Sequence, residues 1–383
     1  MRTPVCDKFD IEFPLFAFSH CRDVVAAVSR AGGLGVLGAL AFTPEELEVE
    51  LAWIDDHVEG KPYGVDLVMP ANYVGKGGVQ PSAEELRAMI PQEYWDYTEK
   101  ILSEYGIPPL PEGYDERARA AGLGVDDQAT RAVETALKHD GVKLLVNALG
   151  PPPKEVVDKA HEHGVLVAAL VGSKHHAEKQ VAIGVDVIVA QGTEAGGHTG
   201  DISTMVLVPE VVDAVGPDVP VLAAGGIGSG RQMTAGLALG AQGAWTGSIW
   251  LTVAEADTPE EAQQNILAAT SRDTVRSRAM TGKPARQLRT KWTEAWEADE
   301  APKTLPMPLQ GILYGEMARR VTRAHNRELS GFPVGQIVGR MDRIRPTHEV
   351  VFELIEDWIA TTEKLCSLLR AEHDAPPIDA REG

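Results

Sequence analysis

The sequence predicts a (β/α)8 TIM barrel with a helical insertion after strand 3 and a mainly helical C-terminal extension. Eight short apolar runs are each followed by a helical pattern or an insertion, and glycine-rich loops follow the sixth, seventh and eighth runs. The runs are apolar nearly throughout, which is typical of parallel strands covered on both faces. An open doubly wound sheet is the alternative, and the count of eight strands favours the barrel.

The expected strands alternate with helices whose ends carry capping residues. Asp23 is expected to be the N-cap of the first helix, and Thr43 the N-cap of the next, with Glu46 completing a capping box. Pro209 is expected in the first turn of a later helix. Glycine follows most of these helices, as it does at left-handed C-terminal caps. The expected strands are 15–18, 36–40, 63–69, 144–147, 165–170, 185–190, 219–223 and 244–246.

Residues 71–140 form a helical insertion that is longer than one strand-to-helix crossover needs. Because this segment leaves strand 3 at its C-terminal end, we expect it near the barrel mouth and not as an independent domain. Its aromatic side chains either shape the mouth of a substrate site or pack the insertion's own small core. The amphipathic patterns are 84–89, 94–105 and 127–138, and the aromatic residues are Tyr73, Tyr94, Trp95 and Tyr97.

The barrel domain is therefore expected at 1–70 and 141–250, and residues 251–383 form the C-terminal extension. An apolar residue recurs every three to four positions near the end of the extension, which predicts a terminal helix with one buried stripe. The residues of the stripe are Val351, Ile355, Trp358, Thr362, Leu365 and Leu369.

Composition excludes several classes of partner. The formal charge of −20 makes a phosphate backbone a poor partner, so we expect no nucleic-acid binding. No apolar run approaches the ~20 residues of a membrane span, and the N-terminus lacks a signal core. The three cysteines, Cys6, Cys21 and Cys366, are few and far apart, which is typical of free thiols in the cytoplasm.

The loop after the sixth strand is a candidate active-site loop. It runs from Gln191 to Gly200 and contains Gly196 and Gly197, which would let a flat ligand lie close to the backbone. His198 is the residue of this loop that exchanges protons near neutral pH. A solvated histidine on a glycine-rich surface loop is the alternative. The position at the C-terminal end of a barrel strand favours the active-site interpretation.

The next two loops predict a phosphate site. Ala224, Gly225 and Gly226 lead into one helix, and Gly247 and Ser248 follow the eighth strand. These loops of a barrel commonly bind phosphate through backbone amides and a helix N-terminus, so no lysine or arginine is needed. Tight turns that require glycine are the alternative. No histidine or cysteine spacing fits a metal site, and we expect none.

Several strings together resemble the nitronate monooxygenase family, formerly called 2-nitropropane dioxygenases. The resemblance runs in order from about residue 5 to residue 250, and the string from Gln191 to His198 is its most specific part. The other strings are 26–35, 64–67, 224–227 and 240–248, and the stretch 331–350 resembles the family's tail.

The resemblance implies FMN at the C-terminal face of the barrel and no metal. It implies oxidation of alkyl nitronates by O2 to a carbonyl compound and nitrite, with nitronate or nitroalkane as substrate and His198 in substrate binding or proton transfer. A homodimer is an open option. The cofactor-binding positions that it implies are Ala17, Phe18, Ser19, Asp66, Gln191, Gly196, Gly197, Ala224, Gly225, Gly226, Gly247 and Ser248.

Three positions depart from the usual family pattern. Phe18 stands in a loop that usually reads Ala-Pro-Met, Asp66 replaces an asparagine, and Leu170 stands where some relatives have a lysine. An acid in place of an amide and the loss of a cation both disfavour a negative ligand nearby. Two other functions stay open: an FMN-dependent NAD(P)H:quinone or enoyl reductase, and a flavin-binding barrel without catalysis.

Overall fold

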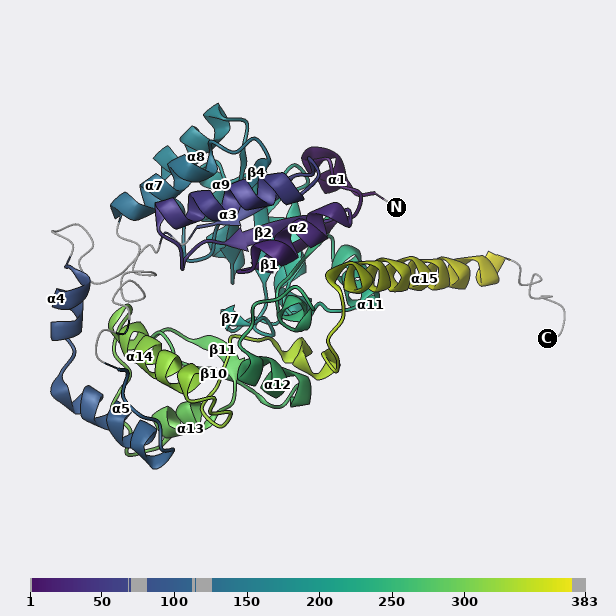
Figure 1. The fold of residues 1–383 in the computed structure, drawn as a ribbon. Helices are drawn as coiled ribbons and strands as arrows, with labels where there is room; N and C mark the ends of the chain where they lie inside the picture. The colour runs from purple at the N-terminus through teal and green to yellow at the C-terminus, as the bar shows by residue number, and fades with distance from the viewer. Residues whose placement is uncertain (1, 68, 70–80, 112–113, 115–125, 374–383) are drawn as a thin grey trace, which may run out of the picture.

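The fold is a closed barrel of eight parallel strands with a second, smaller unit beside it (Figure 1). The computed structural model describes residues 2–67, 69, 81–111, 114 and 126–373 of the chain. The barrel order is β1-β2-β3-β4-β5-β6-β8-β9, and β9 pairs with β1 to close it. These strands are β1 (Leu15–Ser19), β2 (Leu34–Gly38), β3 (Tyr63–Asp66), β4 (Val142–Asn147), β5 (Leu166–Val171), β6 (Val187–Gln191), β8 (Val221–Ala224) and β9 (Gly243–Thr246).

Helices cover the outside of the barrel, as the alternating pattern predicts. The barrel-side helices are α2 (Arg22–Arg30), α3 (Pro44–His57), α7 (Asp126–Ala136), α8 (Lys154–Glu162), α9 (Lys174–Ala182), α10 (Thr204–Val215), α11 (Gly230–Ala238) and α15 (Thr347–His373). The remaining elements are α1 (Pro4–Phe9), α4 (Ala83–Ala88), α5 (Gln92–Glu104), α12 (Glu260–Ala268), α13 (Lys291–Glu297), α14 (Leu309–Arg323), η1 (Ser248–Thr252), η2 (Gln336–Arg340), β7 (Gly197–His198), β10 (Thr274–Ser277) and β11 (Ala285–Leu288).

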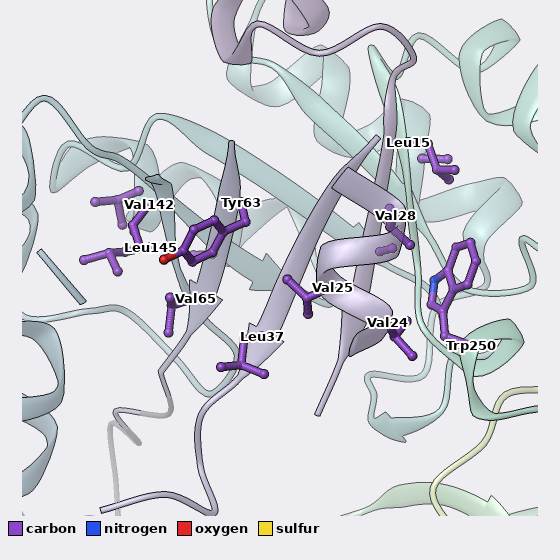
Figure 2. Packing of buried hydrophobic residues seen from close by; sticks show 14 of the residues in the cluster. Leu15, Val24, Val25, Val28, Leu37, Tyr63, Val65, Val142, Leu145 and Trp250 are labelled. Carbon is purple, nitrogen blue, oxygen red and sulfur yellow. The ribbon is translucent and has the colours of Figure 1, made fainter. Parts of the chain in front are cut away.

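Alternation along each strand divides the barrel core into two clusters. On β1, Phe16 packs inside the barrel, whereas Leu15 and Ala17 pack toward the helices. The inner cluster is closed by α1, whose Val5 and Phe9 are buried against the strands. Figure 2 shows the outer cluster, in which side chains of strands and of α2 interlock. Because burial of an apolar side chain contributes about 1.5–3 kcal/mol, this layer dominates the stability of the barrel.

Two helix starts differ from the prediction. The helix α2 begins at Arg22 with Cys21 as N-cap, and Asp23 lies in its first turn, where its negative charge still favours the helix dipole. The helix α10 begins at Thr204, so Pro209 lies inside the helix and not in its first turn. Tertiary contacts explain the earlier start, because the Glu194 carboxylate accepts the Thr204 amide at 2.9 Å. The capping box of Thr43 and Glu46 is confirmed.

The second unit joins the insertion to the C-terminal extension. The helices α4 and α5 pack against α13 and α14, which come some 200 residues later in the chain (Figure 1). Tyr94 and Tyr97 lie against the Trp296 ring at centroid distances of 6.3 and 5.2 Å, and Trp95 lies under the Arg87 guanidinium. Tyr73 lies outside the described residues. The helix α7, in contrast, packs on the barrel against α3.

The terminal helix α15 returns to the barrel and fills the place between α11 and α2. The two helices pack so closely that a Cβ on Gly230 of α11 would lie 2.0 Å from the backbone nitrogen of Trp358. Val351, Ile355 and Trp358 are buried there, but Leu365 is 48% exposed, so the predicted buried stripe is wrong at Leu365. The helix continues past the barrel edge (Figure 1). Within the described residues, no helix combines the length and apolarity that a membrane crossing requires.

Candidate functional site

Several predicted residues face the inside of the barrel at the C-terminal ends of the strands. Phe18 and Leu170 pack against the inner cluster, and Ala224 belongs to it. On β3, Tyr63 and Val65 pack outward, so Asp66 faces inward. On β6, Val187 and Val189 face inward. Because side chains alternate along a strand, Gln191 also faces inward, at the barrel mouth. The barrel thus gathers Phe18, Asp66, Leu170, Gln191 and Ala224 at one end.

Asp66 is a buried acid with no counter-charge among the described residues. The residue is 4% exposed, and within that part of the chain its Oδ1 has no hydrogen-bond partner. Burial raises the pKa of the Asp66 carboxyl to about 8. The carboxyl is therefore mostly protonated at neutral pH and can donate a hydrogen bond, as the amide of an asparagine would. The replacement of the family's asparagine by Asp66 therefore adds no negative charge at this position.

The other residues of the first loop play a different part. The Ala17 side chain packs with the outer cluster, so its backbone is the part that can face a ligand. The Ser19 hydroxyl accepts the Cys21 amide at 3.1 Å at the start of α2. The Phe18 and Trp245 rings are stacked with their centroids 6.3 Å apart, and they form an apolar surface beside the barrel mouth.

The loops after β8 and β9 offer unused backbone donors. These strands are neighbours in the barrel, so their loops lie side by side. Within the described part of the chain, the amides of Gly225, Gly226, Gly247 and Ser248 donate no hydrogen bond. Gly225 and Gly226 have φ values of 99° and 72°, a conformation that favours glycine. A Cβ on Gly247 would meet only the Phe18 ring, at 3.9 Å. Free amides in an open space suit an anion such as phosphate.

The glycine-rich loop after β6 is held from both sides. The Glu194 carboxylate accepts hydrogen bonds from the amide and hydroxyl of Thr204, which ties the loop to α10. On the other side, a Cβ on Gly196 would lie 2.8 Å from the backbone of Val334. Gly335 in turn donates its amide to the Ser248 hydroxyl at 2.8 Å. Gly196 and the Ser248 side chain therefore pack against the backbone of Val334 and Gly335.

His198 belongs to a strand that joins the barrel loop to the second unit. Gly197 and His198 form β7, which pairs antiparallel with β11, with His198 opposite Ala285. The His198 Nε2 lies 2.7 Å from the Thr281 hydroxyl. Burial, and secondly the positive charge of Lys283, lower the pKa of His198 to about 4. The imidazole is therefore neutral at physiological pH.

The structure brings His198 and the free amides to the same end of the barrel, because β6, β8 and β9 are consecutive in the barrel order. The sequence interpretation missed Thr281 and Lys283. They lie 83 and 85 residues after His198, in the turn between β10 and β11. The short polar run Thr281-Gly282-Lys283-Pro284 signals a turn, but nothing in it indicates pairing with a distant glycine-rich loop.

Comparisons with known proteins give a consistent picture. The family model described as nitronate monooxygenase matches residues 2–357. A Mycobacterium tuberculosis protein, named only provisionally as a monooxygenase, is 50% identical over 379 residues, which is 97% of this chain and 100% of the relative. A Staphylococcus haemolyticus protein named a probable nitronate monooxygenase is 28% identical over 347 residues, covering 86% of this chain and 89% of its own.

Two solved structures share the architecture. Nitroalkane oxidase from Streptomyces ansochromogenes superposes with a TM-score of 0.77 at 25% identity, covering 94% of this chain and 99% of that one. FabK from Thermotoga maritima superposes with a TM-score of 0.72 at 28% identity, covering 96% and 99%.

Proposed function

Because the chain belongs to the nitronate monooxygenase family and is a flavin oxidoreductase, we propose that it uses FMN to oxidise alkyl nitronates with O2, giving a carbonyl compound and nitrite. The observation that carries the proposal is the placement of a neutral histidine and a set of free amides at one end of a single barrel. The substrate class and the choice of flavin are part of the proposal.

The residues present fit a flavin that carries one phosphate. The free amides of Gly225, Gly226, Gly247 and Ser248 would hold that phosphate. The sequence has no second pyrophosphate-binding fingerprint, which favours FMN over FAD. The neutral Asp66 carboxyl adds a donor inside the barrel without adding a negative charge beside the cofactor. When bound, FMN supplies the electron-transfer chemistry.

The protein's own contribution is to bind and orient the substrate. His198 is neutral, and Thr281 holds its ring, so its free nitrogen can hydrogen-bond a substrate or exchange a proton with it. Phe18 and Leu170 supply an apolar surface that suits the alkyl part of a nitronate. A small molecule with one charged end and one apolar end is the substrate shape that these groups favour.

A spectroscopic experiment tests the proposal. The purified protein is expected to be yellow and to release FMN, and not FAD, on denaturation. Anaerobic mixing with an alkyl nitronate should bleach the flavin, and readmission of air should yield nitrite. Bleaching by NAD(P)H and not by a nitronate would establish the reductase alternative, and bleaching by neither would favour the non-catalytic barrel. A colourless protein that FMN cannot reconstitute would contradict the cofactor assignment.

Other expectations from the sequence stay predictions. They include a cytoplasmic location, O2 and a nitronate or nitroalkane as the small-molecule partners, and a homodimer. The predicted domain limits at 70, 140 and 250 also stay predictions. The helices α4 and α5 of the insertion pack on α14 of the extension, so an experiment that tests these limits should keep the two segments together.

A further inference from the structure

The second unit contains a cleft that is separate from the residues of the barrel mouth. Its volume is about 770 Å³, within the range of ~300–1,000 Å³ that is typical of small-molecule sites. Its walls come from the end of β10 and the turn after it, the end of α13, and the connection from α13 to α14 (Figure 1). The lining residues are 276–278, 282, 296–297 and 301–306, so neither His198 nor the free amides of the barrel loops belong to the cleft.

The walls of the cleft are positively charged, although the formal charge of the chain is −20. They carry three cations, Arg276, Arg278 and Lys303, and one acid, Glu297. Arg276 forms an ion pair with Asp201. With Asp201 and Glu297 both counted, one excess positive charge remains at the cleft. A local positive charge on an acidic protein attracts anions to that place.

Arg278 and Lys303 form no ion pair within the described residues, so their charges are available to a ligand. The Arg278 guanidinium donates one hydrogen bond, to the Gly282 carbonyl at 2.9 Å, and has further N–H groups to offer. Because a guanidinium presents its donors as a planar fork, it pairs well with the two oxygens of a carboxylate. The two free cations therefore favour a carboxylate as the charged part of a ligand.

Trp296 adds a flat apolar surface and an unused donor. The residue is 6% exposed, and its Nε1 has no hydrogen-bond partner within the described part of the chain. Buried indole N–H groups usually have an acceptor, as Trp292 on the same helix has in the Ala279 carbonyl at 3.2 Å. The rings of Tyr94 and Tyr97 pack against Trp296 and hold it in place. A ligand oxygen beside Trp296 would supply the missing acceptor.

We propose that this cleft binds a small carboxylate with a flat apolar body, at a second site beside the one that we assign to the flavin and its substrate. The carboxylate pairs with Arg278 and Lys303, and the apolar body lies against Trp296, Pro302 and Pro306. One excess positive charge matches a carboxylate better than a phosphate monoester, which carries nearly two negative charges at neutral pH. The inference goes beyond the proposed function and does not depend on the reaction at the barrel mouth.

Calorimetry with phenylacetate tests the charge requirement. The full chain as purified should bind one equivalent at pH 7 and low salt, and it should bind phenylacetamide, which lacks the charge, at least about tenfold more weakly. Lys303→Gln and Arg278→Gln should each weaken phenylacetate binding roughly fivefold, and the double variant at least about 20-fold. Lys100→Gln removes the same charge from an exposed position of α5 outside the cleft, and this matched control should change the affinity less than about twofold.

Nuclear magnetic resonance locates the bound ligand. In protein labelled with 15N-tryptophan, each of the seven tryptophans contributes one indole N–H signal. Trp296→Phe and Trp292→Phe identify two of these signals by their loss. Phenylacetate should shift the signal of Trp296 and leave that of Trp292 in place, because the Trp292 N–H is already bonded to a carbonyl. Trp296→Phe keeps an aromatic ring but loses the donor, so it should bind phenylacetate about threefold more weakly.

Several outcomes would overturn the inference. They are equal affinity for phenylacetate and phenylacetamide, unchanged affinity in the double variant, and no binding of phenylacetate at about 10 mM. Displacement of phenylacetate by an alkyl nitronate, with a Trp296 signal that does not move, would place the anion at the barrel mouth instead. Tighter binding of phenyl phosphate through Arg278 and Lys303 would overturn the choice of a carboxylate. None of these measurements uses turnover, so a failure of the proposed oxidation leaves each of them decisive.

Discussion

At the scale of single residues, the barrel mouth combines two ionisable groups whose shifted pKa values favour the neutral form of each side chain. Burial lowers the pKa of His198 and raises that of Asp66. Each residue was recognisable in the sequence as a candidate, because each follows a barrel strand. Neither protonation state could be predicted, because the burial of each side chain depends on residues that are distant in the chain. A mouth without fixed charge on either group suits a redox cofactor and a small organic substrate.

The first prediction concerns the pH dependence of His198. An unperturbed histidine would become charged near pH 6.5, and an activity that needs the neutral imidazole would then fall below neutrality. Because the pKa of His198 is about 4, its contribution to nitronate turnover should stay constant from pH 8 down to about 5 and fall as pH approaches 4. The kcat profile with a preformed nitronate measures this. His198→Asn should retain FMN and lower turnover by roughly 10²–10⁴. Full turnover in the variant would remove the catalytic assignment.

The second prediction concerns Asp66. A folded pKa of about 8, against ~3.9 in the unfolded chain, means that the folded state holds a proton that the unfolded state releases. Stability from this group is therefore complete below pH ~4 and is lost as pH rises to 8. Asp66→Asn should remove this dependence and stabilise the protein by about 1–3 kcal/mol at pH 8, and by little at pH 4. Chemical unfolding at both pH values measures the difference.

Asp273 offers a control of opposite sign. Hydrogen bonds from Thr270 hold the pKa of its carboxyl below the usual value, so the stability that it contributes is lost as pH falls. Asp273→Asn should therefore destabilise the protein at neutral pH, where Asp66→Asn stabilises it. A stability gain for Asp66→Asn that is equal at pH 4 and pH 8 would show that the carboxyl is not protonated in the fold.

At the scale of elements, local signals predicted the barrel well, and tertiary contacts explain where they did not. The capping box at Thr43 lies in four consecutive residues and needed no other part of the chain. The start of α10 depends on Glu194, ten residues earlier in a loop, so the position of Pro209 suggested the wrong boundary. β7 has two residues and exists because β11 pairs with it, so no local pattern indicates it.

The third prediction tests the loops after β8 and β9. Gly226→Val should reduce FMN affinity at least roughly tenfold, because a branched side chain strains the φ of 72° and fills space beside the free amides. Gly164→Val is the matched control, since Gly164 has a φ of 69° and a Cβ there would meet no atom within 4 Å, but it lies between α8 and β5. Fluorescence titration with FMN measures both. Equal FMN binding in the two variants would place the phosphate elsewhere.

At the scale of the whole molecule, the site lies where the barrel meets the second unit. His198 is on β7, which is the third strand of the β10-β11-β7 sheet, and β10 and β11 belong to the segment that carries α13 and α14. The insertion reaches the same unit through α5. The sequence predicted that the insertion and extension exist, but not that they pack together. Hydrophobic pattern identifies a helix face without naming its partner, and these partners are some 200 residues apart.

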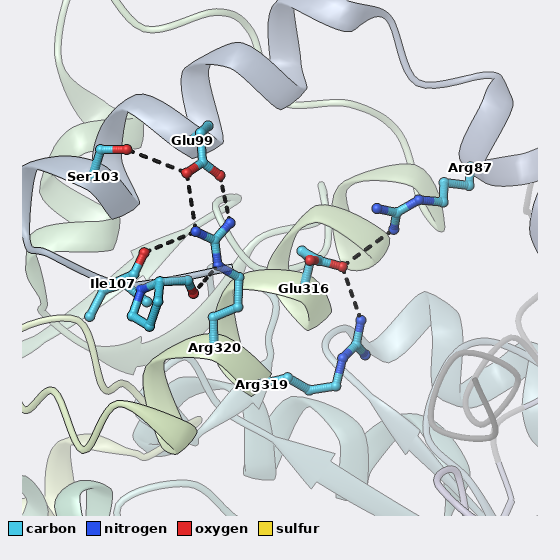
Figure 3. A network of polar contacts seen from close by, with 8 residues as sticks. Arg87, Glu99, Ser103, Ile107, Glu316, Arg319 and Arg320 are labelled. Atoms are coloured by element: carbon cyan, nitrogen blue, oxygen red, sulfur yellow. Dashed lines mark hydrogen bonds and ion pairs between the residues drawn. The ribbon is translucent and has the colours of Figure 1, made fainter. Parts of the chain in front are cut away.

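The last prediction concerns the ion pair that joins the insertion to the extension. Arg320 on α14 is 4% exposed and holds both oxygens of Glu99 on α5, at 2.6 and 3.1 Å (Figure 3). Its guanidinium also donates to the carbonyls of Ile107 and Pro108, at 2.9 and 2.8 Å. A lysine cannot make this fork, so Arg320→Lys leaves buried carbonyls unpaired.

Arg320→Lys should therefore destabilise the second unit by about 2–4 kcal/mol and make residues 81–111 the first site of limited proteolysis. Arg319→Lys is the matched control on the same helix, because Arg319 makes one 3.5 Å contact with Glu316, which also binds Arg87 (Figure 3). Its effect should stay below about 1 kcal/mol. Since the unit also holds β11 against β7, Arg320→Lys should raise KM for the nitronate as the temperature approaches its unfolding transition. Equal protease resistance in both variants would show that the ion pair does not secure the insertion.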